Sequence, residues 1–222
     1  MLLKRYGAAS PYPFEAPGVR YYYFARNAVW TLTRILGLDK GEVLVPAYHH
    51  GVELEALIDA GATPRFFRVN WKMQVDPDDV KKLITPKTKA IYLIHYAGFP
   101  GPAKELKEIA EAHGLPLIED CALSLLSKDG ERPLGSIGDA SIFCLYKTLP
   151  VPNGGALVMN GDRPKGIPAP PEPPMASTLS HLASALLMNL ELRGGAAGRM
   201  LRQSVRAVGR TAVNGAGVER VA

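Results

Sequence analysis

The sequence contains too little cysteine to support a fold held together by disulfides or metal ions. Its 222 residues include only two cysteines, Cys121 and Cys144, and both fall near the ends of predicted strands. Two cysteines in this arrangement form neither a disulfide framework nor a metal-ligand motif. We therefore expect a protein that is stabilised by its apolar core and binds no metal.

Long hydrophobic segments are also lacking. No uninterrupted apolar run approaches the roughly 18–20 residues that span a bilayer, and the first apolar stretch is too short for a secretory signal. These absences predict a cytoplasmic protein. Hydrophobic residues make up 47% of the sequence and charged residues 21%, a balance typical of a globular chain with one sizeable core.

Positive charge is concentrated near the C-terminus. The net charge is +5, and residues 191–222 hold six arginines but only two glutamates. A basic segment of this kind can bind nucleic acid or anionic lipid. Because no aromatic residues or base-reading motifs accompany the arginines, we expect a solvated helix face without either partner.

Between residues 20 and 160, apolar strand-like runs alternate with amphipathic helical segments. The expected strands are residues 20–25, 42–46, 64–69, 90–95, 115–120, 141–145 and 155–159, and the expected helices are 27–36, 51–60, 76–84 and 103–113. Asn27 suits the N-cap of the first helix. The strands are apolar throughout, as in a mainly parallel sheet with helices on both faces. The pattern predicts a three-layer, doubly wound α/β fold with about seven strands.

The flanking segments differ from this central domain in composition. Residues 1–19 are rich in proline and predict an arm that lies on another surface. Residues 161–175 form a proline-rich linker, and residues 176–222 a basic helical tail. The tail is expected to contain an amphipathic helix at 176–192 and a second helix at about 199–208.

Two expected strands lead into charged residues that do not belong in a core. Asp120 ends one strand, and Lys147 follows another. Ligands of α/β folds bind beyond the carboxyl ends of the strands. On position alone, Asp120 is equally suited to cap a following helix, whereas a lysine near a strand end is more often a solvated charge. Pro150 and Pro152 stiffen the loop after Lys147, which favours a functional role for the lysine.

Together the acid and the lysine suggest a cofactor. A lysine in a desolvated pocket has its ammonium form disfavoured, so it can bond covalently to a carbonyl carbon. A carboxylate that keeps a pyridine nitrogen protonated makes that ring an electron sink. This division of labour is found in pyridoxal-phosphate enzymes.

Several segments between Tyr21 and Asn160 resemble the DegT/StrS family of sugar aminotransferases, which are fold-type I pyridoxal-phosphate enzymes. They are VLVPAYHHGVELEALIDAGATPRFFRV, the HxxG turn at 95–98, the IEDCA run, and GSIGDASIFCLYKTLPVPNGGALV. All occur in the order in which the family has them. The resemblance implies the large domain of that fold and pyridoxal 5'-phosphate as the cofactor.

The resemblance also implies roles for residues around the cofactor ring. Asp120 matches the partner of the ring nitrogen, and Lys147 matches the lysine that bonds to the cofactor. Ala122 matches a small residue packed on one face of the ring. His50 occupies the position of an aromatic residue on the other face, with Tyr48 as the alternative.

Other matching positions concern the phosphate and the ring hydroxyl. Arg26 and Asn27 occupy the place of a Gly-Thr pair that binds phosphate at a helix N-terminus, where backbone N–H groups and an arginine can bind an anion. Cys144 replaces a serine that helps to hold the phosphate. Leu123 stands where the family has glutamine or histidine near the ring hydroxyl, and Ser124 is a candidate substitute.

The implied activity is transfer of an amino group from an amino acid, usually glutamate, to a keto sugar nucleotide in a homodimer. A dehydratase or lyase is one alternative, although the branch of that kind replaces the lysine with histidine, and Lys147 is present. A truncated or non-catalytic binding or regulatory protein is another.

Family members continue into a C-terminal domain. In its place, this chain has the proline-rich linker and the helical tail. We therefore expect a fragment, a truncated product or a diverged member that keeps only the cofactor domain, for which cofactor binding is better supported than turnover.

Three histidines and a second acid are expected to have structural roles. His49, His95 and His113 match no catalytic position, although His95 ends a strand at the same sheet edge as Asp120. Glu119 precedes Asp120 and, by strand alternation, points to the opposite face.

Overall fold

The computed structural model describes residues 11–151 and 153–161, and also residues 175, 178–179, 182–184, 186–189, 191–195 and 198–200. The chain divides into two compact units. The first comprises residues 1–149 and 154–170 and contains all the elements named below. The second comprises residues 150–153 and 171–222.

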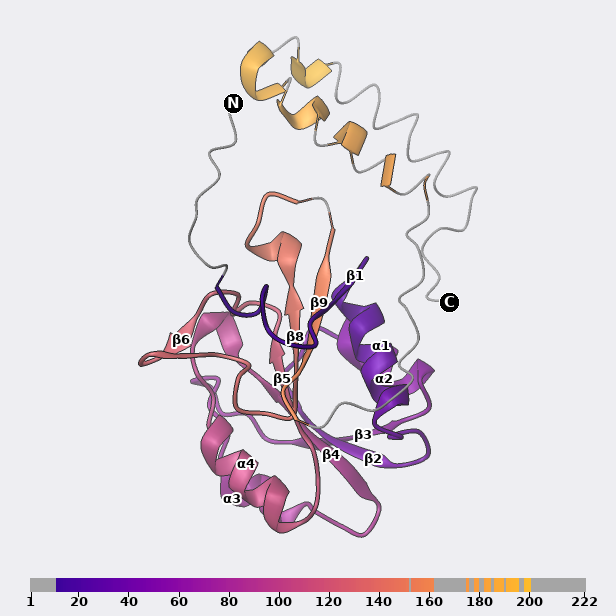
Figure 1. Ribbon diagram of the computed structural model, residues 1–222, viewed down its shortest axis with the longest axis vertical. Coiled ribbons are helices and arrows are strands. Elements are labelled where there is room, and N and C mark those ends of the chain that lie inside the picture. The colour runs from indigo at the N-terminus through magenta and orange to yellow at the C-terminus, as the bar shows by residue number, and fades with distance from the viewer. Residues whose placement is uncertain are drawn as a thin grey trace. The chain divides into compact units, whose positions relative to one another are not determined.

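Seven strands form one sheet in the order β1-β9-β8-β5-β4-β2-β3, with β5 at its centre (Figure 1). Strands β3, β2, β4, β5 and β8 pair in parallel, and β9 runs antiparallel to both β8 and β1. The expected mainly parallel sheet of about seven strands is confirmed. The strands are β1 (Arg20–Tyr22), β2 (Glu42–Pro46), β3 (Thr63–Phe67), β4 (Thr88–Ile94), β5 (Leu117–Cys121), β8 (Ala140–Cys144) and β9 (Gly155–Met159).

Helices cover both faces of this sheet (Figure 1). Helices α1 (Ala25–Ile35) and α2 (Val52–Asp59) pack on one face, and α3 (Pro77–Lys82) and α4 (Ala103–Ala112) on the other. Because successive side chains of a strand alternate between faces, β5 supplies Ile118 to the first core and Leu117 to the second. The two cores hold β5 from both sides, so its backbone has a fixed place at the centre of the domain.

The first helix begins earlier than the sequence indicated. Phe24 has an extended backbone (φ −132°, ψ 155°) and is the N-cap residue. Asn27 is therefore the third helical residue, and the prediction that it caps the helix was wrong. Its Oδ1 instead accepts a hydrogen bond from the Phe24 N–H at 3.1 Å. The side chain satisfies the backbone of the cap residue, as the third residue of a capping box does.

The other elements lie close to their expected positions. Strands β2 and β9 coincide with the predicted ranges. Asp76 caps α3 by accepting the Asp78 N–H at 3.0 Å, and Pro77 occupies the first turn, where it replaces an N–H that has no partner within the helix. The sequence did not predict the small hairpin of β6 (Lys128–Asp129) and β7 (Arg132–Pro133). Two residues per strand are too few for a recognisable alternation.

Residues 11–19 lie on the first unit. Tyr12 and Phe14 pack against a cluster that includes Phe143 of β8, and the Tyr12 hydroxyl donates to the Gly135 carbonyl at 2.5 Å. This part of the N-terminal segment is thus a docked arm.

The second unit is helical wherever residues 175–200 are described. Most of the expected linker (161–175) and of the expected second helix (199–208) lie outside the described residues. Among the helices that the structure does describe, none is long and apolar enough to cross a membrane.

Candidate functional site

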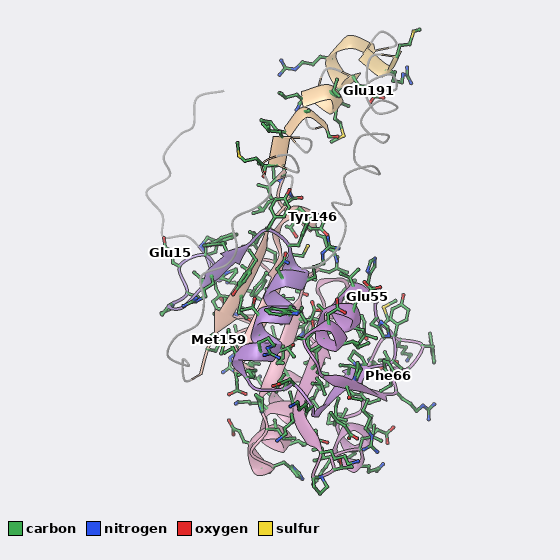
Figure 2. The ribbon with its side chains drawn as sticks, turned by 90° about the vertical axis from the view of Figure 1, so that its right-hand side faces the viewer. Glu15, Glu55, Phe66, Tyr146, Met159 and Glu191 are labelled. Carbon is green, nitrogen blue, oxygen red and sulfur yellow. The ribbon has the colours of Figure 1, made fainter. Side chains whose placement is uncertain are left out.

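A cavity of about 190 Å³ opens where β5 and β8 end, beside the starts of α1 and α2. Figure 2 shows Tyr146 at this end of the sheet and Met159 at the other end of the β8–β9 pair. The cavity is lined by Phe24, Ala25, Arg26, Val29, His50, Val52, Glu53, Asp120, Ala122, Ile142, Cys144, Tyr146 and Lys147. Residues far apart in the sequence meet here because their elements converge on one edge of the sheet.

Most of the expected site residues line this cavity. They are Arg26, His50, Asp120, Ala122, Cys144 and Lys147. Asn27 and Ser124 do not. The Asn27 side chain is engaged with the Phe24 N–H, and the buried Ser124 hydroxyl donates to the His95 carbonyl at 3.0 Å.

Asp120 is a buried carboxylate on the cavity side of β5. Its Oδ2 accepts the Tyr92 hydroxyl at 2.7 Å, and its Oδ1 accepts the Ala122 N–H at 2.8 Å. Burial raises the pKa of Asp120, and these two hydrogen bonds offset only part of the rise. No helix follows β5 in residues 122–127, so Asp120 is not a helix cap. Each oxygen retains acceptor capacity, and a nearby cation would favour the ionised form.

Lys147 lies at the rim of the same cavity. It ends η2 (Leu145–Lys147), a single 3₁₀ turn after β8, and its side chain is exposed. The expectation of a desolvated lysine was therefore wrong for this chain by itself, because η2 carries the residue to the edge of the cavity and not to its floor. The positive charge of Lys147 still acts on Asp120 and favours its ionised form.

The N-terminus of α1 forms another wall. Its first turn carries no acidic residue, and the Arg26 guanidinium carbon lies 4.5 Å from the centre of the Phe24 ring. A Cβ on Gly155 would lie 2.5 Å from the Ala25 nitrogen, so glycine is required for β9 to approach the helix this closely. Free backbone N–H groups and an arginine at a helix start can bind an anion such as a phosphate.

The start of α2 contributes His50 and Glu53. The His50 backbone N–H donates to Glu53 Oε1 at 2.8 Å, which turns the chain into the helix beside the cavity. Tyr48 instead packs against Tyr96, with ring centres 5.7 Å apart, and its carbonyl accepts the Tyr96 hydroxyl. Of the two candidates for a ring-stacking residue, His50 is the one that lines the cavity.

The chain departs from the family pattern at Cys144 and Leu123, and only Cys144 lines the cavity. Burial raises the pKa of the Cys144 thiol, although contacts with Tyr146 and Lys147 oppose the rise. A neutral thiol is a weaker hydrogen-bond donor than the serine it replaces. Leu123 is 53% exposed and is not among the lining residues.

The sequence did not reveal Tyr92 or Glu53 as parts of the site. Tyr92 lies on the same face of β4 as Ile94, which pairs with Asp120, and its hydroxyl is the one polar side-chain group on that face of AIYLIH. Glu53 lies one helical turn after His50. Neither position could be assigned to the site from the sequence, because Tyr92 requires knowledge of the sheet register and Glu53 requires knowledge of where α2 begins.

Glu119 points away from the cavity, as strand alternation predicted. Its Oε2 lies 2.8 Å from Nε2 of the buried His95. His49 stacks on Phe66 with ring centres 5.7 Å apart, and Nδ1 of His113 lies 2.8 Å from the Ile109 carbonyl. None of these three histidines lines the cavity.

Comparison with known proteins gives a family and a fold. A model of the DegT/DnrJ/EryC1/StrS aminotransferase family matches residues 25–166. The chain is 34% identical over 131 residues to GDP-perosamine synthase of Vibrio cholerae. It is 29% identical to DesI, solved in the presence of its TDP-sugar product, with a TM-score of 0.61. NtdA of Bacillus subtilis, solved with bound cofactor PMP, shares the fold at 22% identity and a TM-score of 0.60.

The matched proteins are longer than this chain. The match covers 57% of the chain and 36% of the V. cholerae synthase. The corresponding shares are 82% and 44% for DesI, and 66% and 34% for NtdA. The family match nevertheless contains every residue that lines the cavity except Phe24.

Proposed function

Because this chain belongs to the DegT/DnrJ/EryC1/StrS aminotransferase family, we propose that it forms the cofactor-binding part of a pyridoxal-phosphate-dependent aminotransferase. The observation that carries the proposal is the single cavity that Asp120, Lys147 and the start of α1 line together. An acid, an amine and an anion-binding helix start are the groups needed by the ring nitrogen, the aldehyde and the phosphate of that cofactor.

The residues present fit the cofactor. Asp120 is buried, has spare acceptor capacity and has a raised pKa, so a protonated ring nitrogen beside it would relieve an unfavourable charge burial. The start of α1 offers N–H groups and Arg26, with no acidic residue in its first turn to repel a phosphate.

The cavity is smaller than a complete small-molecule site. Its volume of about 190 Å³ is below the roughly 300–1,000 Å³ typical of ligand pockets, and Lys147 is exposed. We propose that a second copy of the chain supplies the remaining enclosure, as in a homodimer. Measurement of the molecular mass in solution by light scattering, with and without cofactor, tests this, and a monomer in both conditions contradicts it.

Each residue then has a defined role. When bound, the cofactor supplies an electron sink conjugated to the substrate carbon. Asp120 accepts the ring N–H and keeps that nitrogen protonated. Arg26 and the backbone N–H groups at the start of α1 hold the phosphate. Lys147 Nζ would hold the cofactor by condensing with its aldehyde, with loss of water, and as a free amine would take a proton from the substrate α-carbon and return it.

The proposed substrates are an amino acid donor, with glutamate as the first choice, and a keto sugar nucleotide. The GDP-perosamine in one relative's name and the TDP-sugar product of DesI support a nucleotide sugar. We place the reaction in the cytoplasm, since the two cysteines are free and buried, as suits a reducing compartment.

A second candidate is a protein that binds the cofactor without turnover. It is favoured by Ser124, whose hydroxyl is bonded to the His95 carbonyl and cannot replace the group missing at Leu123. The two candidates differ in one result. An aminotransferase half-reaction changes the absorption of the bound cofactor when glutamate is added, whereas a binding protein leaves it unchanged.

Cofactor binding is tested by absorption and mass. The purified chain is mixed with pyridoxal phosphate, its visible spectrum is recorded, and borohydride is added to fix any covalent bond. We expect a protein-bound band and a modified peptide that contains Lys147. Lys147→Ala should lose both, whereas Lys87→Ala, which removes an exposed lysine outside the cavity, should keep both. A parent protein without the band would refute cofactor binding.

A further inference from the structure

Glu119 and His95 form a buried pair directly behind the cavity, on the opposite face of β5. Glu119 is 0% exposed and His95 1%. His95 Nδ1 accepts the Gly101 N–H at 3.0 Å, so a neutral imidazole carries its proton on Nε2. That nitrogen lies 2.8 Å from Glu119 Oε2 and donates to it. The contact is a hydrogen bond from the imidazole Nε2–H to the Glu119 carboxylate.

Glu119 is also bonded to the loop that leads into β8. Its Oε1 accepts the N–H groups of Ile137, at 2.8 Å, and Gly138, and its Oε2 accepts that of Gly135 at 3.3 Å. Burial alone would raise the pKa of Glu119, but the hydrogen bonds from His95, Gly138 and Ile137, together with the electrostatic attraction of His95, outweigh burial and lower the pKa. The carboxylate therefore stays ionised, and its acceptor capacity is used within the protein.

The pair is linked to Asp120 through the backbone. Glu119 precedes Asp120 in β5, and the His95 N–H donates to the Asp120 carbonyl at 3.0 Å. The His95 carbonyl accepts the Ser124 hydroxyl in the turn that follows. His95 thus joins the end of β4 to the end of β5 and to the next turn, and Glu119 joins them to the loop before β8.

We infer that Glu119 and His95 are positioning residues that set where the Asp120 carboxylate lies in the cavity. A functional carboxylate must be held to within about 0.5 Å, which requires support from bonded neighbours. The Asp120 carboxylate accepts only two hydrogen bonds, so its position also depends on a backbone that is fixed from behind. The consequence for cofactor affinity rests on the proposed function, but the positioning itself concerns the free protein.

Variants at the two residues separate this role from general stability. Glu119→Gln keeps the shape but puts an NH₂ group against either the backbone donors or His95. His95→Gln can still donate to Glu119 from the position of Nε2, whereas His95→Asn reaches only the position of Nδ1. The matched control is Asp139→Asn. Asp139 accepts hydrogen bonds from the Leu117 N–H at 2.8 Å and from the Lys107 ammonium at 2.6 Å, and it lies at the ends of β5 and β8 that are remote from the cavity.

The direct readout is amide hydrogen exchange of Ala122, whose N–H bonds to Asp120 Oδ1, measured by NMR on the free protein. Exchange is compared at equal global stability, set by denaturant or temperature. We expect Glu119→Gln and His95→Asn to speed exchange at Ala122 by roughly tenfold, the loss of one buried hydrogen bond to a charged group. His95→Gln should have a smaller effect, and Asp139→Asn none.

Titration with pyridoxal phosphate is the second readout. We expect the variants to weaken cofactor binding in the same order in which they speed exchange at Ala122. The affinity should be roughly tenfold weaker in Glu119→Gln. Unchanged Ala122 exchange in both Glu119→Gln and His95→Asn overturns the inference, and so does an equal change in Asp139→Asn. If Glu119→Gln does not fold, the two histidine variants decide. A parent that binds no cofactor refutes the proposed function alone, since the exchange comparison still decides the positioning.

Discussion

The two faces of β5 carry adjacent carboxylates with opposite properties. Glu119 faces α4 and the loop before β8 and accepts hydrogen bonds from four donors. Asp120 faces the cavity and accepts from two. Both are buried, yet the pKa of Glu119 is lowered and that of Asp120 is raised. Burial disfavours the charge in both cases. At Glu119 the hydrogen bonds and the neighbouring His95 outweigh burial, whereas at Asp120 two hydrogen bonds and Lys147 do not.

The difference distinguishes a structural carboxylate from one that can bind a ligand. Glu119 has its acceptor capacity filled by the protein, so it stabilises the fold and has nothing to offer a substrate. Asp120 accepts fewer hydrogen bonds, so a cation or an N–H donor that binds in the cavity would further favour its ionised form. The contrast can be tested by substitutions on each face.

The largest effect is expected from Glu119→Ala. The change removes the acceptor of four N–H groups, those of Gly135, Ile137, Gly138 and His95, of which all but that of Ile137 are buried. It should lower the free energy of unfolding by about 3–5 kcal/mol. Urea unfolding followed by circular dichroism measures the loss. Glu111→Ala, at a side chain that is 63% exposed, should change the value by less than about 0.5 kcal/mol. A loss below about 1 kcal/mol for Glu119→Ala would show that this face does not stabilise the fold.

On the cavity side, Gly155→Ala should have a smaller effect on stability. The added Cβ would lie 2.5 Å from the Ala25 nitrogen, so the start of α1 must move away from β9. We expect a loss of about 1–3 kcal/mol and weaker binding of pyridoxal phosphate, measured by thermal unfolding and titration. Gly194→Ala is the control, because its Cβ would meet no atom within 4 Å. Equal melting temperatures of parent and Gly155→Ala would show that α1 is not held there.

The two carboxylates should also differ in the sign of their pH dependence. The lowered pKa of Glu119 contributes stability above its ordinary value of 4.5 that is lost as the pH falls through the folded pKa. The raised pKa of Asp120 acts in the opposite direction, because protonation near its folded pKa favours the folded state. Unfolding free energies between pH 7 and pH 3 should therefore fall less in Glu119→Gln than in the parent. The same fall in both proteins would contradict this assignment.

The smallest change in stability is expected from Asp120→Asn. The substitution removes a buried charge whose pKa is raised, and an amide oxygen can still accept the Tyr92 hydroxyl. The free energy of unfolding at pH 7 should stay within about 1 kcal/mol of the parent value or rise, while affinity for pyridoxal phosphate falls. A large destabilisation would place Asp120 with Glu119 among the structural carboxylates.

Much of the fold could be predicted from local patterns. Apolar strands that alternate with capped helices were enough to expect the parallel sheet, and β2 and β9 were placed correctly to the residue. The start of α1 was misplaced because Asn27 is a good cap by composition, yet its side chain bonds backward to Phe24. Whether Lys147 is solvated or enclosed stayed open, because a 3₁₀ turn after a strand has no distinctive sequence pattern.

The sequence by itself determined that Asp120 and Lys147 follow strand ends, and that Glu119 and Asp120 point to opposite faces. These properties depend on the order of residues and on the two-residue period of a strand. Only the tertiary structure decided which acid is satisfied and which lines the cavity. Hydrogen-bond donors such as His95, Gly138 and Tyr92 belong to other parts of the chain, and their positions beside the two acids depend on the packing of the whole sheet.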